Sequence, residues 1–329
     1  MNKQNLQNNN RIGFTLIEIL VVIAIIAVLA GILLAALSGV QEAAKKTQSS
    51  SLMQSFARAC DEFALDHGRY PGLLPETLLG ETDIASTQNA LLELMGGARI
   101  KQLESPTSVV DEYDSFSGTE LFSNETDPVT GLQWSLKFDK QRFGEGPWVN
   151  GRVFEPYFSP KSSDLKYDPD NPDVLPTLVD SWETPIIYLR SARKSGPIID
   201  DPENSGNPNY VLPQFDLPNM EFDLLNTSQS LIYPEDDRIA WLTMLLAHPT
   251  FWEQGTNWTP NGVAWGTSRG SYMLLSAGPD RIYLETSNAP TNPENEQPFQ
   301  ASDLTDASNT NINPSIMESF DDVVIHGGA

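Results

Sequence analysis

Residues 13–37 read GFTLIEILVVIAIIAVLAGILLAAL, and this stretch decides the fold. After Glu18 the run carries no charged side chain, and at about 1.5 Å per residue it is just long enough to cross a bilayer core as a helix. The polar residues before it include Lys3 and Arg11 and no acid. Because cations flank the cytoplasmic end of a membrane helix, residues 14–37 are predicted to span the inner membrane once, with a cytoplasmic N-terminus and an extracytoplasmic, periplasmic C-terminal domain.

The carboxylate of Glu18 lies at the start of this apolar run. A cleaved secretory signal has a shorter apolar core that ends at a small-residue site, whereas this run continues into helix-forming sequence from Ser38 to Asp66. A plain signal anchor has no need of an acid, since an unpaired carboxylate near the bilayer costs a few kcal/mol. We therefore expect Glu18 to be functional and to have a partner.

The segment Gly13-Phe14-Thr15-Leu16-Ile17-Glu18, followed by the apolar helix, resembles the class III signal of type IV pilins and secretion pseudopilins. The resemblance implies that a prepilin peptidase cuts after Gly13, removes residues 1–13 and methylates the new N-terminus at Phe14. Glu18 then occupies the acidic fifth position of the mature chain. Because the methylated amine of Phe14 stays cationic, the Glu18 carboxylate of a neighbouring subunit can pair with it, which predicts a role in assembly.

Apolar residues continue at helical spacing beyond the membrane segment. The predicted stripe consists of Leu52, Phe56, Ala59 and Phe63. It indicates an amphipathic extension of the helix over residues 38–70, interrupted by the polar segment 48–51. The sequence Leu65-Asp-His-Gly-Arg-Tyr-Pro71 predicts the helix end near its glycine, and it resembles the Leu-Asp-x-Gly-x-Tyr-Pro element of major type II secretion pseudopilins.

Residues 71–329 are predicted to form an extracytoplasmic globular domain. Residues 86–95 indicate a short capped helix, and residues 104–131 and 160–177, rich in Ser, Thr, Asp and Pro, are expected to be loops or insertions. The fold class is then α+β: a long N-terminal transmembrane and amphipathic helix packed on a small antiparallel β-sheet, with large loop insertions.

Three separated segments near the C-terminus resemble the sheet elements of major pseudopilins. They are 180–188 (DSWETPIIY), 272–280 (YMLLSAGPD) and 319–325 (SFDDVVI). Two positions depart from the family pattern, because Glu183 and Arg281 stand where the family usually has glycine. Residues 180–188 predict a turn that leads into a β-rich run. Residues 272–280 followed by 281–285 predict two strands about a Gly-Pro-Asp turn.

The resemblance also implies calcium, held by Asp280, Asp321 and Asp322. Calcium is a hard cation that takes about 6–8 oxygen ligands, and acids brought together by a turn suit it. About forty residues separate Asp280 from Asp321, where the family usually has a short loop, so the site is open to remodelling or loss. The alternative is that these acids cap turns and solubilise the surface.

Composition excludes several classes of protein. The chain has 20 Lys+Arg against 44 Asp+Glu, for a net charge of −24, which would repel nucleic acid rather than bind it. One cysteine cannot form an intrachain disulfide, and Cys60 with three scattered histidines predicts no zinc site.

The predicted function is therefore structural rather than enzymatic, since no Ser/His/Asp arrangement, nucleotide loop or metal triad stands out. The expected partners are further copies, other pilins or pseudopilins, the prepilin peptidase, the inner-membrane assembly platform and membrane lipid. A type II secretion pseudopilus and a type IV pilus both remain open, as do major and minor subunit roles. The alternative is a membrane-anchored glycan-binding or adhesive module, or an enzyme, exported by a pilin-type signal.

Overall fold

The computed structural model describes part of the chain. The described ranges are 16–103, 112–169, 174–194, 196–199, 213–216, 224–225, 242–243, 245–248, 267–285 and 320–328, without the side chains of 32–38. The chain divides into two compact units, Met1–Lys45 and Lys46–Ala329, which are described separately below.

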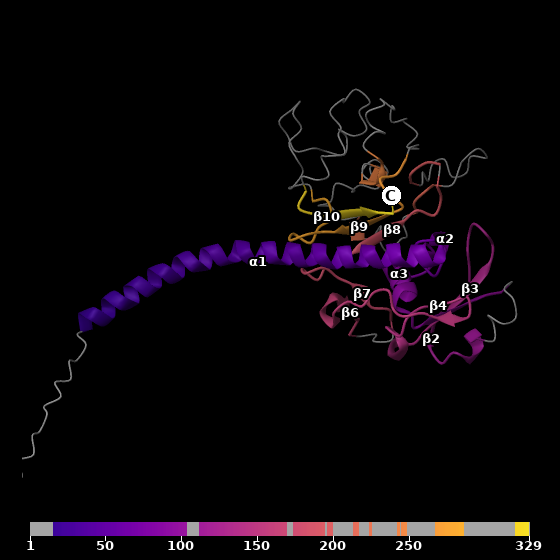
Figure 1. Ribbon diagram of the computed structural model, residues 1–329, viewed down its shortest axis with the longest axis horizontal. Coiled ribbons are helices and arrows are strands. Elements are labelled where there is room, and N and C mark those ends of the chain that lie inside the picture. Colours follow the sequence, from indigo (N-terminus) through magenta and orange to yellow (C-terminus); the bar gives the residue numbers. More distant parts are fainter. Residues whose placement is uncertain are drawn as a thin grey trace, which may run out of the picture. The chain divides into compact units, whose positions relative to one another are not determined.

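One continuous helix, α1 (Leu16–His67), has 52 residues and belongs to both units (Figure 1). No proline interrupts it, and its first half is built from the aliphatic residues of the apolar run. In the first unit these side chains are exposed, for example Leu16 at 82% and Ile17 at 69%. Within the described part of the chain, no helix is both long and apolar enough to cross a membrane. The span over residues 14–37 stays a prediction.

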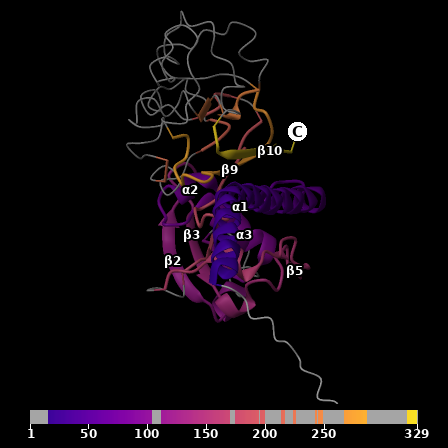
Figure 2. The same cartoon turned by 90° about the vertical axis from the view of Figure 1, so that its left-hand side faces the viewer.

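In the second unit, α1 buries one stripe of side chains. Phe56, Ala59 and Phe63 are buried as predicted, whereas Leu52 is only half-buried. The buried stripe also contains Met53, Ala57 and Cys60. These residues share one core with the helix α3 (Ser86–Met95) and with the strands β8 (Ile187–Arg190) and β9 (Tyr272–Ser276). Figures 1 and 2 show this half of α1 between the sheet that contains β8 and β9 on one side and α3 with a second sheet on the other. A long helix packed on antiparallel sheets confirms the predicted pilin-like α+β class.

The first sheet contains the strands β8 (Ile187–Arg190), β9 (Tyr272–Ser276) and β10 (Val323–Gly327). All pairs are antiparallel in the order β10-β9-β8, with Tyr188 opposite Leu274 and Val324 opposite Leu275. Alternate residues point to opposite faces: Tyr188 and Leu274 pack on α1, while Leu189 and Leu275 enter a second core. Each of the three segments that resemble the family's sheet elements therefore contributes a strand to one sheet. The prediction of a second strand at 281–285, after the Gly-Pro-Asp turn, is wrong, because residues 281–284 form turns and bends.

A second antiparallel sheet has the order β1-β3-β2. Its strands are β1 (Ala98–Gln102), β2 (Thr119–Thr126) and β3 (Gln133–Phe138). The short helix α2 (Glu76–Leu79) and part of α3 pack against it through Leu78, Leu79 and Leu92. The smaller elements are β4 (Trp148–Val149), β5 (Arg152–Val153), β6 (Leu165–Lys166), β7 (Thr177–Leu178), η1 (Lys140–Arg142) and η2 (Ser162–Asp164).

The region before residue 180 was only partly predictable. The helix α3 has the predicted bounds 86–95. The expectation of loops over 104–131 is wrong, because β2 occupies 119–126. The sequence of this edge strand has no clean alternation of apolar and polar residues that would predict a strand. All eight of its residues are exposed or half-buried, and two register shifts interrupt its pairing with β3.

Candidate assembly site

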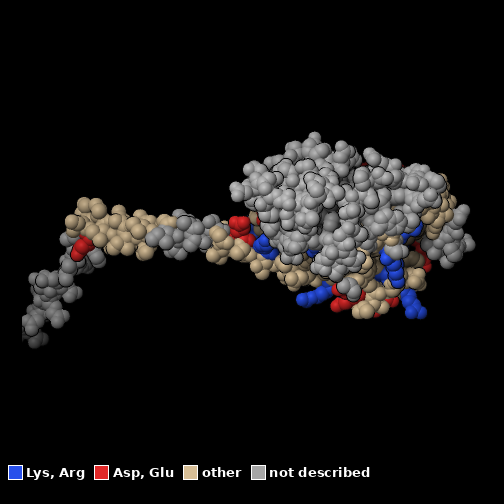
Figure 3. All heavy atoms as spheres, turned by 90° about the horizontal axis from the view of Figure 1, so that it is seen from above, with Lys and Arg blue, Asp and Glu red and all other residues tan. Residues whose placement is uncertain are grey.

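The predicted processing residues Gly13 and Phe14 lie outside the described residues. Glu18, the predicted assembly residue, lies in the first turn of α1, where the helix dipole favours a carboxylate. Its neighbours Ile17 and Ile19 are exposed at 69% and 55%. In Figure 3 the described start of α1 shows one acidic patch and no basic atom. This carboxylate therefore lies in an apolar surface that a bilayer or other subunits can cover.

The end of α1 shows what the Leu65–Pro71 element does. Gly68 ends the helix with φ of 72°, a backbone conformation that suits glycine, and its N–H donates to the carbonyl of Ala64 at 2.8 Å. The Tyr70 ring lies 5.1 Å from that of Tyr272 on β9, and the Tyr188 hydroxyl donates to the Pro71 carbonyl at 3.3 Å. The element therefore both stops the helix and fixes its exit to the sheet.

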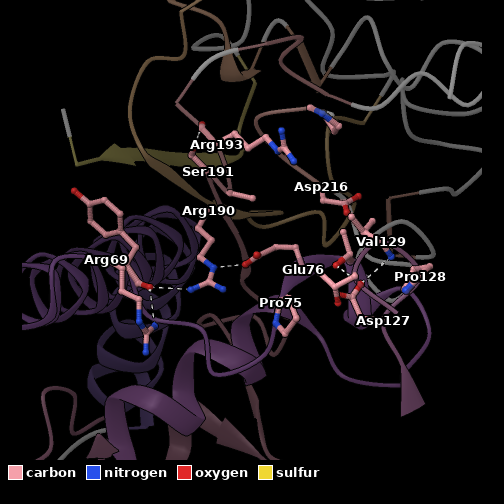
Figure 4. Close-up of a pocket in the computed structure, with 15 residues that line it drawn as sticks. Arg69, Pro75, Glu76, Asp127, Pro128, Val129, Arg190, Ser191, Arg193 and Asp216 are labelled. Atoms are coloured by element: carbon pink, nitrogen blue, oxygen red, sulfur yellow. Dashed lines mark hydrogen bonds and ion pairs between the residues drawn. The ribbon is translucent and has the colours of Figure 1, made fainter. Parts of the chain in front are cut away.

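Two ion pairs that the sequence did not suggest lie at this exit. Arg69 pairs with Glu93 of α3, whose side chain is only 2% exposed. Arg190, at the end of β8, pairs with Glu76 of α2 and donates to the carbonyl of Tyr70 at 2.8 Å, as Figure 4 shows. Burial alone would lower the pKa of Arg190, but the Glu76 carboxylate raises it above its ordinary value. One signal of this pair was present in the sequence: Arg190 ends a strand whose other side chains are apolar or aromatic.

Asp180 joins two of the family-like segments. Its buried carboxylate accepts hydrogen bonds from the backbone N–H groups of Trp182 and Thr184, both at 2.9 Å, and from the Ser276 hydroxyl of β9 at 2.7 Å. Ser49 of α1 accepts from the Ser181 N–H at 2.9 Å. The polar segment 48–51, which interrupts the apolar stripe of α1, therefore contributes a hydrogen bond to the turn that precedes β8.

The two departures from the family pattern keep a glycine-like backbone. Glu183 has φ of 67° and Arg281 has φ of 66°, both in the left-handed region. For residues with a Cβ this region costs about 1–2 kcal/mol. Both positions therefore have a backbone conformation that glycine would adopt without this cost.

Restoring glycine at these turns should stabilise the protein. We expect Glu183→Gly and Arg281→Gly each to raise the free energy of unfolding by about 0.5–1 kcal/mol, because relief of strain exceeds the added freedom of the unfolded chain. The Glu183–Lys166 pair lost in the first variant is exposed and 3.8 Å long, so it contributes little. Chemical unfolding measures the effect. Ser181→Gly is the control: its φ is not positive, so that variant should be neutral or less stable. A loss of stability in both turn variants would contradict the strain argument.

The three predicted calcium residues lie near one another without forming a ligand set. Asp280 accepts from the Ile282 N–H at 2.9 Å, and both oxygens of Asp322 accept from the Leu284 N–H at 3.2 Å. Burial, and then the charges of Asp321 and Glu285, raise the pKa of Asp280 to about 6. Burial, Asp321 and Asp280 also raise the pKa of Asp322. In the described ranges no three His, Cys, Asp or Glu residues are arranged to hold a metal ion. Calcium stays a prediction.

Comparison with known proteins gives an independent view of the N-terminal segment. Residues 8–34 match the prokaryotic N-terminal methylation motif. This match includes Gly13, Phe14 and Glu18, and it agrees with the resemblance that those residues indicate. No solved structure matches the chain.

Curated relatives extend the likeness beyond the motif. The type II secretion system core protein G of Pectobacterium carotovorum subsp. carotovorum is 44% identical over 59 residues, which are 18% of this chain and 38% of that protein. The core protein G of Aeromonas hydrophila is 36% identical over 66 residues, 20% of this chain and 46% of the relative. A fimbrial protein of Neisseria meningitidis serogroup B is 28% identical over 140 residues, which are 43% of this chain and 72% of the fimbrial protein. The chain spans less than half the length of either core protein G.

Proposed function

We propose that this chain is a pilin-like structural subunit, processed by a prepilin peptidase and assembled into a type II secretion pseudopilus or a type IV pilus-like filament. The observation that carries the proposal is the methylation motif with Glu18 at the start of an apolar helix. In this account residues 14–37 anchor the subunit in the inner membrane before assembly, and the body beyond α1 is extracytoplasmic. The subunit acts by polymerising and needs no catalytic group.

The exposed aliphatic surface of α1 supports this account. Leu20, Ile25 and Ile26, which lie on different sides of the helix, are all more than half exposed. A helix that is apolar all round needs an apolar environment, which a bilayer provides before assembly and packed helices provide in a filament. Glu18 is the one polar group in this surface able to define the register between subunits.

Processing gives the first test. When the full chain is produced together with a prepilin peptidase, we expect the mature protein to begin at Phe14 and to carry a methyl group on its amine. Intact-mass and N-terminal peptide analysis measure this directly. Changing Gly13 to a bulky residue such as leucine should leave residues 1–13 attached. Cleavage at another bond, or cleavage independent of Gly13, would contradict the proposal.

We also propose calcium as a ligand of the C-terminal acids. Burial and the charges of Asp321 and Glu285 raise the pKa of Asp280, and a bound divalent cation would favour its charged form. Excess calcium should then raise the melting temperature above that in chelator, by mass action on the folded state. Asp321→Asn should raise the melting temperature in chelator and reduce the response to calcium. Identical melting in calcium and chelator would remove calcium from the account.

A further inference from the structure

Two neighbouring cavities lie beside the end of α1, one of about 680 Å³ (Figure 4) and one of about 760 Å³. They share lining residues, and together they are called the groove below. Both cavities are lined by Arg69, Tyr70 and the segment 191–193. The first extends to Pro128 and Val129, and the second runs along α1 past Ala64, Leu65 and Gly68.

The groove exposes cations on a strongly acidic protein. Arg193 and Lys194 are both exposed and adjacent in sequence, and among the residues that the structure describes neither forms an ion pair. Figure 4 shows Arg193 directed into the first cavity. Four acids also line the groove, and each has an interaction partner. Glu76 pairs with Arg190, and Asp127 accepts from the Thr77 hydroxyl at 2.7 Å and the Val129 N–H at 3.1 Å. Asp61 accepts from the Tyr272 hydroxyl at 3.2 Å, and Asp216 also has a partner.

The same groove also exposes apolar side chains. In the described part of the second unit, four large apolar side chains are at least half exposed: Leu65, Leu103, Val129 and Val153. Leu65, at 86%, lines one end of the groove, and Val129, at 50%, lines the other. The second cavity therefore combines an exposed apolar side chain, Leu65, with Arg193, which has no ion pair within the described ranges, and arginine is enriched in protein interfaces.

Charge complementarity identifies the occupant. The chain carries 44 acidic residues against 20 basic ones, so bodies packed in a filament repel one another unless cations of one meet acids of the next. Two grooves cannot face each other across a two-fold axis, because Arg193 and Lys194 would meet their own copies. A groove that meets a different, acidic surface makes a heterologous contact, and heterologous contacts produce open helical assemblies.

We propose that this groove is a subunit–subunit docking site in which Arg193, Lys194 and Leu65 receive an acidic surface of a second copy of the chain. The inference rests on the proposed function, since it assigns a body contact to the same filament. It adds to the Glu18 pairing a contact that is sensitive to salt, because Arg193 and Lys194 are exposed.

Site-specific photo-crosslinking tests the proposal. A photo-crosslinking amino acid replaces Ala192, which lies in the groove beside both cations, in the full chain produced with its processing and assembly machinery. We expect an adduct to a second copy, mapped by mass spectrometry to an acidic segment of the body. Arg193→Glu combined with Lys194→Glu should abolish it, whereas Arg193→Lys with Lys194→Arg should preserve it. The matched control reverses two exposed cations elsewhere, Arg152→Glu with Lys161→Glu, and should keep the adduct.

A second crosslinker at Ile17 separates failure of the groove from failure of the filament. An Ile17 adduct between copies, with no Ala192 adduct or with one to a different protein, overturns the groove and leaves the proposed function standing. Loss of both adducts overturns both. An unchanged melting temperature in the charge-reversed variant shows that its fold is intact, and an adduct that survives charge reversal also overturns the proposal.

Discussion

Glu18→Ala is expected to leave the chain inserted and processed but to abolish filament assembly. The carboxylate lies in an apolar surface, and its expected partner is the methylated amine of Phe14 on a neighbouring copy. Removing one member of such a desolvated pair costs about 3–5 kcal/mol. At about 1.4 kcal/mol per factor of ten, this weakens each subunit contact at least 100-fold. The measurement is the fraction of protein in sheared or pelleted filaments.

The matched control is Glu42→Ala, which removes an exposed acid from the same helix outside the motif. That variant should assemble normally. Glu18→Gln should fail like Glu18→Ala, because it keeps the size of the side chain and loses the charge. Filaments of normal length and number from Glu18→Ala would refute the pairing.

Arg190→Met is expected to cause the largest loss of stability in the body, about 3–5 kcal/mol. The change leaves the Glu76 carboxylate, whose side chain is 9% exposed, without its cation. It also leaves the carbonyls of Tyr70 and Leu74 without the donors that fix the exit of α1. Chemical unfolding of the full chain in detergent, followed by tryptophan fluorescence, measures the loss.

Two further variants make this result specific. Arg142→Met breaks an exposed pair with Glu145 and should cost less than about 1 kcal/mol. Adding Glu76→Gln to Arg190→Met removes the buried charge and should recover part of the stability. If Arg190→Met and Arg142→Met have equal effects, the buried pair is not the anchor described here.

The predictable parts of this fold were those with local or motif signals. The glycine at residue 68 and the proline at residue 71 marked the helix end, and α1 ends at His67. The segments 180–188, 272–280 and 319–325 were identified as sheet elements, and each contributes a strand to one sheet. In each case the signal lies in a few consecutive residues, through turn chemistry or a run of strand-forming side chains.

The parts that could not be predicted depend on distant partners. Arg190 and Glu76 are 114 positions apart, so no local pattern could join them. Ser49 looked like part of a polar interruption, because its hydrogen-bonding partner Ser181 lies 132 positions away. Met53 and Cys60 also belong to the buried stripe of α1. The width of that stripe depends on the sheet that packs on the helix, so the sequence of the helix alone did not predict them.

Assembly of copies through the region around Glu18 can be measured by photo-crosslinking from Ile17. The experiment uses membranes that contain the processing and assembly machinery, with and without Glu18→Ala. We expect an adduct that maps to residues 14–18 of a second copy and disappears in the Glu18→Ala variant. An adduct that persists in that variant, or no adduct between copies in the unmodified chain, would contradict it.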